Sequence, residues 1–150
     1  MIYASLLKYN ESGELIGDLA ENFTQQEGGL VVEFQLKEGV RWHDGEPLEA
    51  DDVVFTLNAL KNQAWQSPLW RTFQGVTVEA ADSRTVVVRA NAFIPSFLHL
   101  FTVGIVPKHI WENVEPSRAR LASWNIKPVG AGPFKFQSLA KNRDEIINFY

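Results

Sequence analysis

The 150-residue sequence contains no cysteine, which excludes disulfides, thiolate metal ligands and a cysteine nucleophile. It also contains no apolar stretch near the roughly 20 residues that a membrane-spanning helix needs. Basic residues are neither in excess nor clustered, since 14 Lys and Arg stand against 18 Asp and Glu. A surface that binds nucleic acid or an anionic membrane needs such a cluster. We therefore expect no nucleic-acid partner and no membrane span.

The sequence does show a period of two in several segments, where apolar residues alternate with polar ones as in a strand with one buried face. These segments are 30–37 (LVVEFQLK), 75–80 (GVTVEA), 85–90 (TVVVRA), 134–139 (FKFQSL) and 145–150 (EIINFY). The short polar links at 81–84 and 140–144 predict that the last four segments form two antiparallel pairs.

Helical periodicity is clearest in 51–61 (DDVVFTLNALK), where Val53, Leu57 and Leu60 share one face. The helical periodicity is weaker in 95–101 (PSFLHLF) and in 107–114 (PKHIWENV), where Pro107 would suit the first turn of a helix. Strands and helices do not alternate as βαβ units, so the pattern predicts an α+β fold, a mixed and mainly antiparallel sheet with flanking helices.

The segment 39–60 begins as GVRWHDGEPLEADD and has two interpretations. His43, Asp44, Asp51 and Asp52 could form the site of a metal-assisted hydrolase, which needs ligands converging within about 2.0–2.2 Å of one ion. Alternatively, Asp44-Gly45 is a turn, and Asp51 and Asp52 stabilise a helix N-terminus by about 0.3–1 kcal/mol each.

We favour the structural interpretation, because adjacent residues rarely converge on one point and no second histidine lies at helical spacing from His43. His99 and His109 each lie in an apolar, helix-like segment, where a lone histidine is typically a satisfied surface or core residue. The sequence thus predicts no catalytic residue, no metal site and no cofactor.

Four blocks resemble, in their order and spacing, the family 5 extracellular solute-binding proteins, the peptide and nickel receptors of ABC importers. The blocks are 17–23 (GDLAENF), 31–60 (VVEFQLKEGVRWHDGEPLEADDVVFTLNAL), 105–111 (IVPKHIW) and 127–136 (KPVGAGPFKF). Members of this family are roughly three to four times longer, with two lobes that close over a ligand. The resemblance implies that residues 1–150 are a single partial domain, an N-terminal-lobe fragment of a two-lobed periplasmic-binding-protein-like fold. The apolar start and the strand-like end of the chain agree with this expectation.

The resemblance also implies a function without catalysis. The complete protein would capture a small solute, in particular an oligo- or dipeptide, and deliver it to the membrane permease of an ABC importer. Its location would be periplasmic or extracellular, with a lipid anchor as one option. The alternative in another class is a ligand-sensing module of a regulator with the same fold.

The segment 63–73 (QAWQSPLWRTF) is the candidate ligand contact, because the loop at this place in peptide-binding relatives lies close to the cleft. Trp70 is the first candidate, followed by Trp65, Leu69 and Phe73. An aromatic face offers a large contact area at a small cost in rotamer entropy. The alternative is that Trp65 and Trp70 pack on the sheet core, as we expect for the other tryptophans, Trp42, Trp111 and Trp124.

The sequence departs from the family pattern at two places. Glu49 stands where the family usually has Thr or Ser as the helix N-cap, and a longer side chain fits the free amides less well. Residues 130–134 read GAGPF where the family commonly has GTGPY, which removes two hydroxyls near the region between the lobes. We expect the two glycines to allow a sharp backbone path before a strand.

Overall fold

The computed structural model describes residues 1–139 and 147–149 and confirms the α+β class. The strands are β1 (Leu7–Tyr9), β2 (Leu15–Gly17), β3 (Ala20–Gln26), β4 (Val31–Leu36), β5 (Val76–Ala80), β6 (Thr85–Ala90), β7 (Phe136–Leu139) and β8 (Ile147–Phe149). The helices are α1 (Ala50–Lys61), α2 (Trp70–Phe73) and α3 (Lys108–Trp111). Short 3-10 helices are η1 (Glu27–Gly29), η2 (Gln63–Trp65), η3 (Phe97–Thr102), η4 (Pro116–Leu121) and η5 (Ser123–Asn125).

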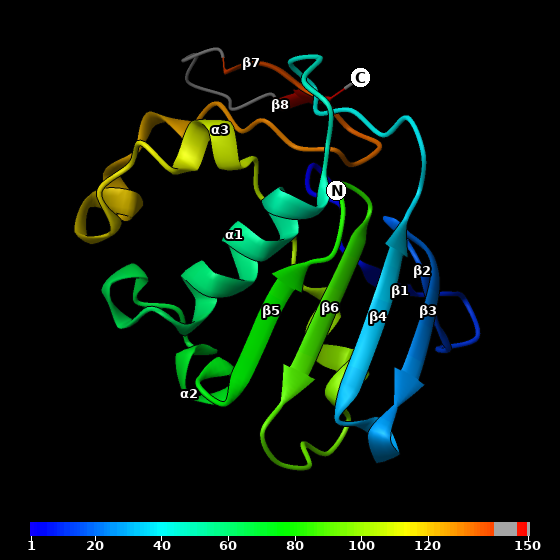
Figure 1. The fold of residues 1–150 in the computed structure, drawn as a ribbon. Helices are drawn as coiled ribbons and strands as arrows, with labels where there is room; N and C mark the ends of the chain where they lie inside the picture. The colour runs from blue at the N-terminus through cyan, green and yellow to red at the C-terminus, as the bar shows by residue number, and fades with distance from the viewer. Residues whose placement is uncertain (140–146, 150) are drawn as a thin grey trace.

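The main sheet is antiparallel and has the order β3-β4-β6-β5 (Figure 1). The predicted strands β4, β5 and β6 occupy its centre and one edge, and β5 and β6 form the predicted hairpin. The turn of this hairpin is fixed by Asp82, whose carboxylate accepts the Arg84 N–H and the Thr85 hydroxyl, each at 2.8 Å. These hydrogen bonds, that of the Arg84 backbone first, lower the pKa of Asp82.

Strand β3 forms the other edge, and the sequence did not predict it. Its sequence, AENFTQQ, is mostly polar, and of its residues only Ala20 is buried. An edge strand that is largely exposed has no reason to alternate apolar and polar residues, so its only signal is its pairing with β4. The small β1-β2 hairpin was missed for a different reason, because strands of three residues are too short to show a period of two.

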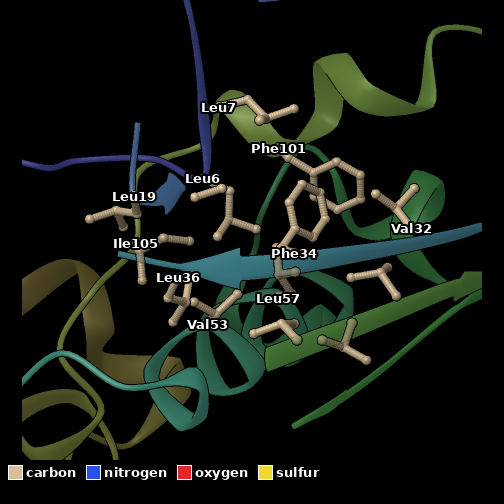
Figure 2. Close-up of a cluster of buried hydrophobic side chains, with 14 of the residues drawn as sticks. Leu6, Leu7, Leu19, Val32, Phe34, Leu36, Val53, Leu57, Phe101 and Ile105 are labelled. Atoms are coloured by element: carbon tan, nitrogen blue, oxygen red, sulfur yellow. The ribbon is translucent and has the colours of Figure 1, made fainter. Parts of the chain in front are cut away.

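One face of the sheet carries the core. Phe34 on β4 has no exposed surface, and its ring lies 4.8 Å from that of Phe101 in η3. Val53 and Leu57 of α1 approach the same cluster, and Figure 2 shows their side chains beside β4 and β6. Helix α1 thus buries Val53 and Leu57 of the predicted apolar face; of its two acidic residues, Asp51 is exposed and Asp52 is buried.

Two helix predictions in the last third of the chain changed. Residues 97–102 form a 3-10 helix that follows Ser96 in the left-handed region, φ 58°, and not a regular helix. The segment 107–114 forms only α3, with Pro107 as the residue before the first turn and Pro116 beginning η4. Strands β7 and β8 pair as predicted, but the predicted loop at 140–144 lies outside the described residues. In the described part of the chain, no helix combines the length and the apolarity needed to cross a bilayer.

Candidate functional site

His43 is a structural clamp. Its Nε2 lies 2.8 Å from the carbonyl oxygen of Gly132, and the Gly130 N–H donates to its Nδ1 at 3.3 Å. The backbone N–H of His43 also donates to the Gly130 carbonyl at 2.8 Å. Both ring nitrogens are therefore occupied by backbone groups of the 130–132 segment, which suits the neutral tautomer with its proton on Nε2. Neither nitrogen is free to bind a metal or to act as a base.

The two glycines that His43 contacts are required by close packing. A Cβ on Gly132 would lie 2.5 Å from the carbonyl oxygen of Met1, and one on Gly130 would collide with the carbonyl oxygen of Ile2. Gly132 N–H donates to the same Ile2 oxygen at 2.7 Å. Neither glycine has a positive φ. The two glycines are therefore required by the close approach of two backbone segments, and not by the sharp backbone path that we expected.

Asp52 joins three segments. Asp52 is only 6% exposed. Its carboxylate accepts the Trp42 indole N–H at 3.3 Å, the Glu49 N–H at 3.0 Å and the Lys108 N–H at 2.8 Å. The contact with Glu49 is the returning half of a capping box, so Asp52 satisfies the helix start although Glu49 is a poor cap residue. These bonds fix the start of α1 against Trp42 and α3.

Asp44 and Asp51 also have structural partners. Asp44 Oδ2 lies 2.8 Å from His109 Nε2, and Asp51 lies 2.9 Å from Lys108 Nζ. The hydrogen bond and the charge of Asp51 raise the pKa of Lys108. The bonds of His43, Asp44, Asp51 and Asp52 thus do not converge on one point, and among the described residues no group of His, Asp and Glu is arranged to hold a metal ion.

Replacing His43 by Ala should destabilise the protein by about 1–2 kcal/mol, because the two ring hydrogen bonds to the 130–132 backbone are lost at about 0.5–1.5 kcal/mol each. Urea unfolding followed by circular dichroism measures this change. His109→Ala is the matched control, since within the described residues its ring bonds to Asp44 alone, in an exposed pair worth below about 1 kcal/mol. Equal midpoints for the two variants would contradict the clamp.

The aromatic segment 63–73 is held in a defined conformation. The Asn62 side chain accepts the Ala64 N–H at 3.0 Å to begin η2, and Gln66 then takes the left-handed region at φ 53°. The hydroxyl of Ser67 accepts the Leu69 N–H at 3.2 Å and shapes the turn before α2. These local bonds set the direction of the Trp65 and Trp70 side chains.

The four candidate ligand contacts lie in different environments. Trp65 is partly buried, with ring centroids 6.0 Å from Phe55 and 6.1 Å from Trp111. Trp70 is also partly buried, and the Arg71 guanidinium lies 5.3 Å from its ring centroid. Leu69 packs against the core cluster. Phe73 is 0% exposed and belongs to that cluster, so its expected ligand contact is replaced by a packing role.

Trp65 forms part of the wall of a cavity of about 310 Å³, which we call the Trp65 cavity. Its other walls come from α1, from the 104–106 segment, from α3 and from η5, and its lining includes Tyr3, Leu60, Val106, Trp111 and Asn125. This volume is at the lower end of the roughly 300–1,000 Å³ of small-ligand pockets. Leu69, Trp70 and Phe73 are not among the residues that line it.

Most of this lining could not be predicted from the sequence. Tyr3 lies at the start of the chain, and Trp111 was assigned to packing, which its exposure of 7% supports even though one of its edges reaches the cavity. Residues so far apart in the chain lie together because residues 4–5 pair with residues 104–105, from which the chain continues to α3. No local pattern carries that information; only the richness in aromatic residues was a usable signal.

The fold is α+β, and the conspicuous carboxylates of the 39–60 segment serve its architecture. A family model, "Bacterial extracellular solute-binding proteins, family 5 Middle", matches residues 14–148. The chain belongs to this family. Its relatives of oligopeptide-binding type, such as AppA, are solute-binding proteins and not enzymes.

Two relatives illustrate the similarity. The oligopeptide-binding protein AppA of Bacillus subtilis is 33% identical over 141 residues, covering 91% of this chain and 26% of its own length. Its structure in complex with a nonapeptide matches with a TM-score of 0.87 and 32% identity, over 94% of this chain and 29% of that chain. NikZ of Campylobacter jejuni, solved in complex with Ni(L-His), gives a TM-score of 0.86 and 32% identity, over 94% and 28%.

A relative of a different kind is the HTH-type transcriptional regulator SgrR of Salmonella typhi, which is 27% identical over 150 residues, covering 99% of this chain and 25% of the regulator. In each comparison the chain spans only about a quarter to three tenths of the relative's length.

Proposed function

We propose that the chain is part of the first lobe of an ABC-importer receptor that captures an oligo- or dipeptide outside the cytoplasm and delivers it to the membrane permease. The observation that carries this proposal is the match to AppA, over 94% of the chain at a TM-score of 0.87, in a structure that holds a nonapeptide. The proposal includes a periplasmic or extracellular location, which the description of the family as extracellular supports.

The mechanism that we propose is closure of two lobes. Ligand contacts that exist only in the closed form shift the population towards that form, which the permease then recognises. The contribution of this chain would be a rigid wall. Asp52 and His43 tie α1, α3 and the 130–132 segment together, so the aromatic segment 63–73 is presented from a fixed support.

Peptide binding tests this proposal. We expect a pool of di- to pentapeptides to give a saturable change in tryptophan fluorescence of the full-length protein. Trp70→Ala should weaken binding by about tenfold, because a lost aromatic contact of about 1.4 kcal/mol corresponds to that factor. The same titration with EDTA should be unchanged, since peptide capture needs no metal ion.

Trp124→Ala is the matched control, because Trp124 is a 37% exposed tryptophan in η5 that does not line the Trp65 cavity. It should leave the affinity within about twofold of wild type. Loss of all binding with EDTA would instead indicate a metal complex of the kind bound by NikZ. A saturable response that Trp70→Ala leaves intact would remove Trp70 from the cleft.

A second candidate function is the ligand-sensing module of a regulator, and the specific observation that favours it is the match to SgrR across 99% of the chain. A helix-turn-helix segment in the same polypeptide, together with ligand-dependent binding to promoter DNA, would support it. The receptor is preferred because AppA and NikZ have the higher identities.

A further inference from the structure

The Trp65 cavity has a chemical character that narrows the ligand. Among the described residues, the ten that line it include no Asp, Glu, Lys, Arg or His. Its bulk comes from two tryptophans and from aliphatic side chains such as Leu60 and Val106. An ionised group placed there would lose its hydration without gaining a partner of opposite charge, which is strongly unfavourable.

The polar groups of the lining are mostly used within the protein. The Thr56 hydroxyl donates to the Asp52 carbonyl at 2.8 Å, and the Ser67 hydroxyl accepts the Leu69 N–H. The Asn125 amide donates to the Ala119 carbonyl at 2.8 Å. These bonds hold the walls in place and leave an apolar interior for a guest.

Tyr3 is the exception. Its hydroxyl has no hydrogen-bond partner within the part of the chain that the structure describes, although its ring is partly buried. Burial raises the pKa of Tyr3, so the phenol remains protonated at neutral pH and can donate or accept one hydrogen bond. The cavity thus combines aromatic walls with a single free polar group.

The aromatic walls are also braced. Phe55 meets Trp65 edge-on with an interplanar angle of 90°, and Trp111 lies on another side of Trp65 at 55°. A ring that already packs against two others loses little conformational entropy when a ligand binds. This suits a preformed pocket for one side chain better than a flexible surface for a whole peptide.

We propose that the Trp65 cavity binds one uncharged side chain of the captured solute, either aromatic or bulky and aliphatic, and excludes Lys, Arg, Asp and Glu. The proposal rests on the proposed peptide-receptor function and deepens it by naming the class of side chain. A solute that places such a side chain in the Trp65 cavity is bound more tightly than a solute of the same length with a charged side chain at that position.

The test uses three mixtures of pentapeptides. Each peptide is penta-alanine with one residue replaced, by Phe in the first mixture, by Lys in the second and by Glu in the third. Each mixture contains the replacement at every position. Isothermal titration calorimetry on the full-length protein should show the Phe mixture binding at least about tenfold more tightly than the Lys or Glu mixture. The variant Ala59→Leu narrows the cavity from α1 and should bring the three affinities within about threefold of one another. Ala64→Leu is the matched control, because Ala64 is exposed and outside the lining, and it should keep the wild-type preference.

The outcomes separate the two proposals. If penta-alanine and all mixtures fail to bind, the receptor proposal fails and this inference fails with it. If penta-alanine binds but the Phe, Lys and Glu mixtures bind equally, or if Ala59→Leu keeps the preference while its unfolding midpoint equals that of wild type, only the inference is overturned.

Discussion

Asp52→Ala should destabilise the protein by about 3–5 kcal/mol, the largest effect that we expect from a single polar substitution. The carboxylate accepts three N–H groups, from Trp42, Glu49 and Lys108, in a residue that is only 6% exposed. Removing it leaves buried donors without partners, each at a cost of about 1–3 kcal/mol. Urea unfolding of the wild type and the variant measures the difference in the free energy of unfolding.

Asp51→Ala is the matched control for this experiment. It removes the same charge from the same turn of α1, but the Asp51 side chain is 63% exposed and pairs only with Lys108. Such surface pairs contribute about 0–1 kcal/mol. Asp52→Asn, which retains one acceptor oxygen, should fall between the two. A loss for Asp52→Ala no greater than that for Asp51→Ala would show that the carboxylate does not join the three segments.

Gly130→Ala should destabilise the protein by about 3 kcal/mol, at the upper end of what added volume in a packed site produces. The new Cβ would collide with the carbonyl oxygen of Ile2, and backbone atoms cannot turn aside as a flexible side chain can. The collision would also displace the Gly130 N–H from the Nδ1 of His43. Thermal unfolding monitored by circular dichroism should show a clearly lower Tm.

The control for Gly130→Ala is Ala131→Gly, one residue along the same segment. This substitution adds backbone freedom to the unfolded chain without adding volume. We expect it to lower the free energy of unfolding by only about 0.4–1 kcal/mol. A Tm for Gly130→Ala that equals that of Ala131→Gly would mean that residues 1–2 do not lie against the 130–132 segment.

Together, these contacts explain why the segment 39–60 resembles a reactive site without being one. Carboxylates and a histidine are needed there because three chain segments meet at the start of α1, and each brings backbone N–H and C=O groups that must be bonded. Asp52 and His43 supply those bonds. The polar side chains of this segment therefore serve the architecture.

Much of the fold was predictable because it depends on local periodicity. Strand β4 follows from the alternation of Val32, Phe34 and Leu36, and α1 follows from the spacing of Val53 and Leu57, since each pattern places apolar groups on one face of its element. The exposed edge strand β3 was not predictable, because a strand with little buried surface needs no such pattern.

The sequence by itself determined the α+β class, the family resemblance and the central elements β4, β5, β6 and α1, because neighbouring residues decide which face of an element is apolar. Only the tertiary structure decided the roles of the side chains. His43 meets Gly132 across 89 positions and Asp52 meets Lys108 across 56. The Trp65 cavity likewise joins Tyr3 to Trp111. Such contacts depend on how whole elements pack, and residue spacing along the chain does not encode that packing in a readable form.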